Sequence, residues 1–170
     1  MKFAITLRLD CATDRSLHEF RAQLSASASI HDSYSTHVTL AAFDAEVQPG
    51  DLWRGLEDFA ARWSRIPITL SGLGIFPGVR PVVWAAPAAN YILIKMQREL
   101  CKLLDGINVY DAFNENCWIP HVTLFTKISN FSEAIESASL KWRPIHGFLE
   151  KFDLISFPPV EVKHSMLLKM

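Results

Sequence analysis

The sequence lacks the features that mark several common classes of protein. It has no apolar run approaching the roughly 18 residues of a membrane-spanning helix, and its amino terminus is too short and too alternating for a signal peptide. Its cysteines, Cys11, Cys101 and Cys117, are odd in number and form no Cys-x-x-Cys pair, which indicates free thiols in a reducing compartment. These absences predict a cytoplasmic protein that does not enter a membrane.

The chain also lacks an excess of charge of either sign. It has 17 Lys and Arg against 18 Asp and Glu, and 49% of its residues are hydrophobic, as in an ordinary globular protein. So little net charge argues against binding long nucleic acid through bulk electrostatics. At 170 residues the chain can bury a core as a single domain, residues 1–170. We expect a monomer whose partner is a nucleotide or a short oligonucleotide.

Sequence motifs for cofactors and metals are missing as well. Gly72 and Gly74 are followed by a Pro-Gly turn instead of a third glycine and a helix, so they do not make a dinucleotide-binding loop. There is no Gly-Lys-Ser/Thr loop, no Gly-x-Ser-x-Gly elbow, no His-x-His and no His-Glu-x-x-His. We therefore expect no cofactor and no metal.

The sequence does contain the tetrapeptide His-Val-Thr-Leu twice, at residues 37–40 and again in the second half of the chain. Such a repeat indicates an internal duplication. In a β-strand, residues i and i+2 share a face, so His37 and Thr39 point one way and the apolar residues between and after them point to the core. The same holds for His121 and Thr123. A pseudo-two-fold axis between the halves would bring both polar faces to one cleft.

Two imidazoles and two hydroxyls around one point suit the cleavage of a phosphodiester. Imidazoles titrate near neutral pH, so one can take a proton from the attacking oxygen while the other gives a proton to the leaving oxygen. Hydroxyls and backbone N–H groups can hold the phosphate oxygens as their charge grows. This chemistry needs no metal. The residues do not tell which of His37 and His121 is the acid.

Hydrophobic periodicity predicts the same order of elements in each half, namely strand, helix, motif strand, helix, strand. The expected strands cover residues 2–9, 36–43, 66–76, 82–86, 120–127, 145–157 and 162–169. The expected helices begin near Thr13 and Pro49, cover 89–105, and run from a cap at Asn130 to about residue 139, with loops over 25–35 and 108–118.

This order predicts an α+β fold with two lobes, formed by residues 1–80 and 81–170 approximately. Two antiparallel sheets would face a central cleft, with the helices outside. The strand over 82–86 both closes the first unit and opens the second, so we expect strands to be exchanged between the lobes.

Paired His-x-Thr motifs, one in each half of a chain of this length, resemble the two-histidine (2H) phosphoesterase superfamily. This superfamily includes 2′-5′ RNA ligase-like proteins and cyclic nucleotide phosphodiesterases. The second motif, within the run Trp-Ile-Pro-His-Val-Thr-Leu at 118–124, is similar to the Pro-His-x-Thr-Leu form of the family. Segments 72–76 and 80–84 resemble the link between its motifs.

The resemblance implies a bilobal fold and metal-independent hydrolysis of 2′,3′-cyclic or 2′-5′-linked nucleotide phosphates, with weak reverse RNA ligation. It implies that His37 and His121 are the acid and base, and that Thr39 and Thr123 bind the phosphate. Further substrate contacts are expected from aromatic and basic residues near the motifs: Phe76, Arg80, Trp118, Phe125 and Lys127, with Trp84 as another candidate for stacking on a base.

Two departures from the family pattern concern basic residues. Many RNA ligase-like members have Lys or Arg after the first motif, where this chain has Ala41 and Ala42. An Arg often follows the second motif, where this chain has Phe125, Thr126 and Lys127. Residues two apart share a strand face, so Lys127 lies on the same face as His121 and Thr123 and could take the place of that Arg. Fewer basic residues favour a small or short substrate.

Two other functions remain as alternatives. One is a nucleotide- or RNA-binding module that uses the same cleft with little turnover. The other is a scavenger of signalling oligonucleotides, which only a panel of substrates would separate from the first hypothesis. A pure binding module has no need of two acid–base groups, so the presence of both histidines and both threonines favours an enzyme.

Overall fold

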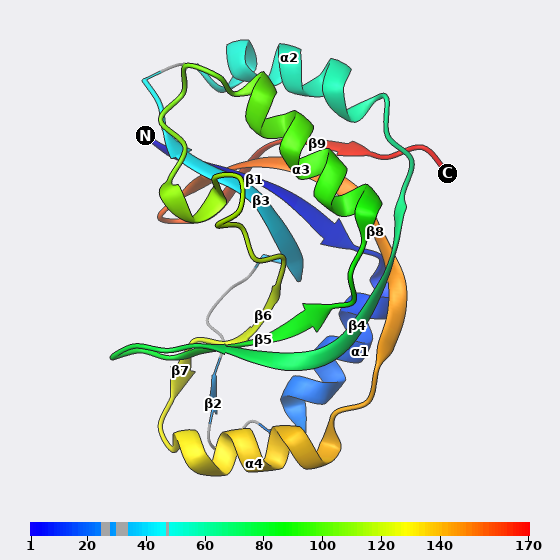
Figure 1. Ribbon diagram of the computed structural model, residues 1–170, viewed down its shortest axis with the longest axis vertical. Coiled ribbons are helices and arrows are strands. Elements are labelled where there is room, and N and C mark those ends of the chain that lie inside the picture. The colour runs from blue at the N-terminus through cyan, green and yellow to red at the C-terminus, as the bar shows by residue number, and fades with distance from the viewer. Residues whose placement is uncertain (25–27, 30–33, 47) are drawn as a thin grey trace.

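The computed structural model describes residues 1–24, 28–29, 34–46 and 48–170, and it shows a mixed α/β fold (Figure 1). Seven strands form one large antiparallel sheet in the order β1-β3-β6-β5-β4-β8-β9. The strands of this sheet are β1 (Lys2–Leu9), β3 (His37–Asp44), β4 (Ile66–Phe76), β5 (Val82–Pro87), β6 (Val122–Phe125), β8 (Ile145–Phe157) and β9 (Glu161–Leu167). Strands β2 (Ala28–Ser29) and β7 (Lys127–Ile128) pair with each other separately.

Four α-helices are found in the described residues: α1 (Cys11–Ala22), α2 (Pro49–Ala60), α3 (Tyr91–Leu103) and α4 (Phe131–Lys141). In Figure 1, α2 and α3 lie toward the end of the molecule that holds β1, β3 and β9, and α1 and α4 lie toward the other end. None of the helices in the described part of the chain is long and apolar enough to cross a membrane.

The element order agrees closely with the prediction, and the differences are local. The strand expected over 120–127 is divided into β6 and β7, and a short 3-10 helix, Asp111–Phe113, interrupts the loop expected over 108–118. The loop expected over 25–35 falls mostly outside the described residues. Helix α1 starts earlier than expected, because the side chain of Asp10 accepts hydrogen bonds from the N–H groups of Ala12 and Thr13 and thereby caps it.

In the described residues the expected pair of separate sheets is not found, because the β3–β6 contact and β8 both join the strands of the two halves into one sheet. The first residues of β8 pair with β4, where His146 lies opposite Thr69, and its later residues pair with β1, where Asp153 lies opposite Thr6. A strand of 13 residues can bend between two sets of partners, and β8 has β9 on its other edge as well.

The strands of the two halves are interleaved in this sheet. The third strand of the first half, β4, pairs with β5, which opens the second half. The third strand of the second half, β8, pairs with β1, which opens the first half. Each half therefore supplies a strand that lies beside the first strand of the other half.

One large hydrophobic core includes residues from the sheet and from all four helices. Its largest fully buried side chains include Phe3, Leu17, Phe43, Phe59 and Phe152. The motif residues Val38, Leu40, Val122 and Leu124 are also fully buried, as alternation along a strand predicts. Burial of these apolar residues fixes the orientation of the two motif strands, so that their polar residues point away from the core.

Candidate active site

The two motifs meet where β3 and β6 touch. Val38 lies directly opposite Val122 in antiparallel register, and each is the central residue of its own His-Val-Thr. Extending that register places each histidine beside the threonine of the other motif. The structure agrees for one such pair, because His37 and Thr123 line the same small hollow. The site is therefore built from mixed pairs, one residue from each half of the chain.

The two histidines are held by the same contact. Nδ1 of His37 lies 2.9 Å from the backbone carbonyl oxygen of Ser35, and Nδ1 of His121 lies 2.8 Å from that of Ile119. A carbonyl oxygen can only accept, so each Nδ1 carries the hydrogen. In a neutral ring the other nitrogen, Nε2, is then the one that can take up a proton. Each motif thus fixes its histidine in the tautomer that acid–base catalysis through Nε2 requires.

Aromatic side chains surround His121. The ring of Phe76 meets it edge-on with centroids 4.8 Å apart, and Trp84 lies 5.9 Å away. Burial lowers the pKa of His121, and the hydrogen bond to the carbonyl of Ile119 opposes that shift only in part. The neutral, proton-accepting form of His121 is therefore favoured near neutral pH. Phe76, which we expect to contact the substrate, thus lies beside the histidine of the second motif.

Trp84 can lie beside His121 only because its neighbour on β4 is a glycine. Gly74 is opposite Trp84 in the β4–β5 register. A Cβ atom at Gly74 would stand 2.3 Å from the indole ring, so no larger residue fits without moving Trp84. The indole also contacts Phe76, with ring centroids 5.0 Å apart. The aromatic wall beside His121 therefore depends on this glycine.

Polar and charged residues surround His37 instead. The ring of Tyr34 lies 4.8 Å from the imidazole, centroid to centroid. Its hydroxyl donates to the Asp153 carboxylate at 2.6 Å and is 2.7 Å from the hydroxyl of Thr6. Asp153 is fully buried and pairs with Arg8, with Nε and Oδ2 2.5 Å apart. Burial and the nearby carboxylate raise the pKa of Tyr34, so its hydroxyl stays protonated and this network holds the ring against His37.

Trp118 connects the two motifs. It precedes the second motif in sequence, but its indole N–H donates to the backbone carbonyl oxygen of Thr39 in the first motif, at 2.9 Å. The ring also packs against the hydrophobic core. Trp118 was expected near the substrate, and the structure places it at the site as a link between β6 and β3.

The other expected substrate contacts lie in different surroundings. Phe125, expected as a substrate contact, does not face the site, because an irregularity in the β5–β6 register shifts the alternation of faces there. Phe125 is 2% exposed and belongs to the core. Arg80 is exposed in the turn between β4 and β5. The backbone of Lys127 lies in β7, and its side chain is outside the described part of the structure.

Sequence reasoning missed two residues of the site, Arg21 and Tyr34. Both line the hollow that holds His37 and Thr123, together with Ser35, Thr36 and Thr126. Arg21 comes from the last turn of α1, far from either motif in sequence, and Tyr34 comes from a segment expected to be a loop. Periodicity carries no signal for such contacts, because they depend on how the helix and the loop pack against the strands.

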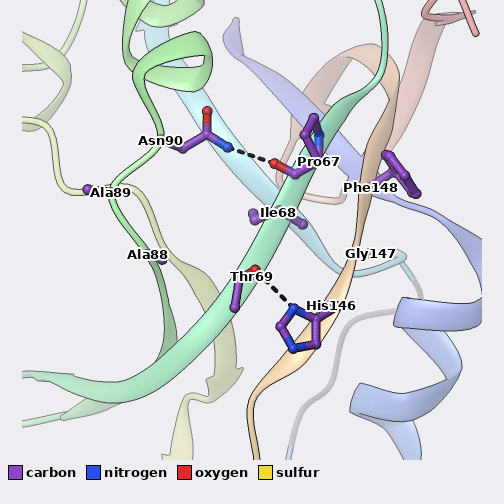
Figure 2. A pocket seen from close by; sticks show the side chains of 9 residues that line it. All are labelled: Pro67, Ile68, Thr69, Ala88, Ala89, Asn90, His146, Gly147 and Phe148. Atoms are coloured by element: carbon purple, nitrogen blue, oxygen red, sulfur yellow. Dashed lines mark hydrogen bonds between the residues drawn. The ribbon is translucent and has the colours of Figure 1, made fainter.

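A larger hollow, of about 370 Å³, lies over the β4–β8 pair and the start of α3 (Figure 2). Its polar side chains bond within the protein. The amide of Asn90 donates to the carbonyl oxygen of Pro67 at 2.7 Å, and Thr69 Oγ1 and His146 Nδ1 are 3.1 Å apart. His146 thus lines this hollow. Neither motif contributes to it.

Among the described residues, no group of three or more His, Cys, Asp or Glu side chains is arranged to hold a metal ion. Cys11, Cys101 and Cys117 are free thiols.

Known structures share this fold over nearly the whole chain. The crystal structure of TT0787 from Thermus thermophilus aligns with a TM-score of 0.67 and 15% identity, covering 99% of this chain and 98% of that one. LigT of E. coli, complexed with NADP+, aligns with a TM-score of 0.65 and 20% identity over the same shares. Usb1 of Kluyveromyces marxianus, with uridine monophosphate, aligns with a TM-score of 0.53 and 10% identity, covering 99% of this chain and 97% of that one.

No curated protein matches this chain in sequence. A sequence profile of the 2′-5′ RNA ligase superfamily, however, matches residues 9–158 and so includes both His-Val-Thr-Leu motifs. The resemblance seen in the motifs is thereby confirmed, and the chain belongs to the 2′-5′ RNA ligase superfamily, within the 2H phosphoesterases.

Proposed function

We propose that the protein is a metal-independent phosphodiesterase that acts on 2′,3′-cyclic or 2′-5′-linked nucleotide phosphates and catalyses the reverse ligation weakly. The observation that carries the proposal is the matched anchoring of His37 and His121, each through Nδ1 to the carbonyl two residues before it. A binding module has no use for two imidazoles held in one tautomer. Acid–base catalysis needs both of them in that state.

In this mechanism the phosphate lies at the β3–β6 contact, between the mixed His–Thr pairs. Nε2 of one histidine takes the proton from the attacking water, and Nε2 of the other gives a proton to the ribose oxygen that leaves phosphorus. The hydroxyls of Thr39 and Thr123 donate hydrogen bonds to phosphate oxygens whose negative charge grows in the transition state. In ligation the same two imidazoles exchange their roles.

A nucleotide substrate is supported by the neighbouring structures and by the aromatic wall. Structures of E. coli LigT hold 3′-AMP and ATP, and that of Usb1 holds uridine monophosphate. In this chain the partly buried ring of Phe76 beside His121 offers a surface on which a base can stack. We also propose that the protein acts in the cytoplasm as a monomer of one domain and without a cofactor.

Turnover of a substrate panel in EDTA tests the proposal. The panel contains the four 2′,3′-cyclic nucleotides, a 2′-5′ oligoadenylate and a 3′-5′ control. We expect wild type to cleave a 2′-linked or cyclic substrate, and His37→Asn and His121→Asn to lose about 10²- to 10⁴-fold in kcat while remaining folded. His146→Asn, a change in the separate hollow over β4 and β8, is the matched control. A loss of activity in EDTA that a divalent metal restores would contradict the mechanism. Nucleotide binding without turnover would favour the alternative of a nucleotide- or RNA-binding module.

A further inference from the structure

Cleavage of a phosphodiester places extra negative charge on the phosphate, so a nearby cation would stabilise the transition state. The strands that carry the motifs do not offer one in the described residues. Ala41 and Ala42, which follow the first motif, are buried, and so is Phe125 after the second. The positive charge of this site has to come from another element.

Helix α1 brings a cation to the site. Arg21, in its last turn, donates a hydrogen bond from Nη2 to the backbone carbonyl oxygen of Thr123. Its partly buried side chain lines the hollow that His37 and Thr123 share. Among the described residues lining that hollow, Arg21 is the one Lys or Arg. A full positive charge is thus held between residues of the two motifs.

Helix α1 packs on β8, and hydrogen bonds near both motifs fix the position of Arg21. Two turns earlier on the helix, Asp14 accepts hydrogen bonds from the backbone N–H and the side-chain hydroxyl of Thr36, the residue before His37. Residues two turns apart lie on nearly the same face of a helix. One face of α1 therefore contacts the residue before the first motif through Asp14 and the second motif through Arg21.

We propose that Arg21 binds the substrate phosphate and stabilises the charge that develops on it during cleavage. A guanidinium is always charged and presents its N–H donors in a plane that matches two phosphate oxygens. This assignment rests on the proposed phosphodiesterase function, and it deepens that function by naming the residue of this chain that neutralises the phosphate. It also predicts that an anionic phosphate by itself has affinity for the site.

The test compares Arg21→Gln, Arg21→Lys and Arg21→Ala with Arg15→Gln, a control on an exposed position of the same helix. The readouts are kcat/KM on the substrate that wild type cleaves best, the Kd for inorganic phosphate by 31P NMR titration, and the Tm. We expect Arg21→Gln to lose about 10²- to 10³-fold in kcat/KM and at least about tenfold in phosphate affinity. Arg21→Lys should recover part of both, because it restores the charge without the planar donors.

Chemical rescue separates this role from a structural one. Millimolar guanidinium should restore part of the activity of Arg21→Ala and leave wild type and His121→Ala unchanged. If Arg21→Gln binds phosphate and turns over substrate as Arg15→Gln does, the inference is overturned. It is equally overturned if activity falls only in proportion to Tm and guanidinium rescues nothing, because Arg21 then merely ties α1 to β6. If wild type cleaves nothing but binds phosphate through Arg21, the proposed function fails and the phosphate contact stands.

Discussion

His37 and Thr123 come from different motifs and line the same hollow. The pairing follows from the antiparallel contact of Val38 with Val122, which sets each histidine next to the other motif's threonine. The two copies of His-Val-Thr therefore meet at one place, where the neighbour of a histidine comes from the other copy.

This pairing predicts the effect of removing either hydroxyl. Thr123→Val and Thr39→Val keep the size and the β-branch of the side chain but lose the donor, so each should lower kcat by about 10²- to 10³-fold. The serine variants should keep most of the activity. Steady-state kinetics on the best panel substrate provide the measurement. A valine variant as active as its serine counterpart would show that the hydroxyl does not bind the phosphate.

The contact between Gly74 and Trp84 predicts a sharp difference between two glycines of β4. Gly74→Ala would place a Cβ 2.3 Å from the indole, so Trp84 must move, at a cost of about 1–3 kcal/mol in unfolding free energy and with a loss of activity at His121. Gly72→Ala meets nothing within 4 Å and should be neutral or slightly stabilising. Urea unfolding and kcat/KM of the two variants test this, and equal effects would contradict it.

The buried carboxylate of Asp153 predicts a large loss of stability when its charge is removed. Asp153→Asn leaves Arg8 without its charged partner and weakens the bond to Tyr34, so we expect the unfolding free energy to fall by about 3–5 kcal/mol. Asp51→Asn, which breaks the exposed ion pair with Arg54, should cost less than about 1 kcal/mol. Urea denaturation measures both. A small effect at Asp153 would mean that the network is not needed to hold Tyr34.

The aromatic side chains around His121 predict that its imidazole titrates with a lowered pKa. Since burial lowers its pKa, the NMR midpoint should lie below the usual value of about 6.5, and Phe76→Ala should raise it by admitting water. Phe131→Ala, on the exposed start of α4, should leave it unchanged.

The same pKa shift makes stability depend on pH with a definite sign. The unfolded chain binds the proton of His121 more tightly than the native state does. Wild type should therefore lose stability as the pH falls below about 6.5 toward the native pKa, whereas His121→Asn should lose less over that range. Urea unfolding at pH values of about 7.5 and about 5.5, on either side of the unfolded pKa, measures the difference. Equal pH dependence in both proteins would contradict the shift.

Local patterns in the sequence were sufficient for the element order and for the burial pattern of the two motif strands. Alternation predicts that Val38 and Val122 are buried and that the histidines point away from the core, because these are properties of a single strand. The cap at Asn130 is confirmed as well, since its side chain accepts from the N–H of Glu133. Such features depend on neighbours within a few residues.

What the sequence could not predict depends on contacts between distant segments. The irregularity between β5 and β6 turns Phe125 into the core. The alternation of residues along one strand cannot predict such an irregularity, because it depends on the pairing with the neighbouring strand. Arg21 reaches the site because α1 packs on β8 and ends beside the second motif, and Tyr34 reaches the site through the fully buried Asp153 of β8. In each case the position follows from tertiary packing.

The interleaving of β4 and β8 also bears on how such a chain can have arisen and how it can be divided. A polypeptide containing either half alone would leave its first strand without the partner that the other half provides, and it would carry only one histidine. Two copies of such a half could each supply the missing partner strand of the other by exchanging their third strands. The resulting symmetric homodimer would already contain a pair of histidines. In the single chain the two halves are free to differ, and they do: an aromatic wall stands beside His121 and a charged network beside His37.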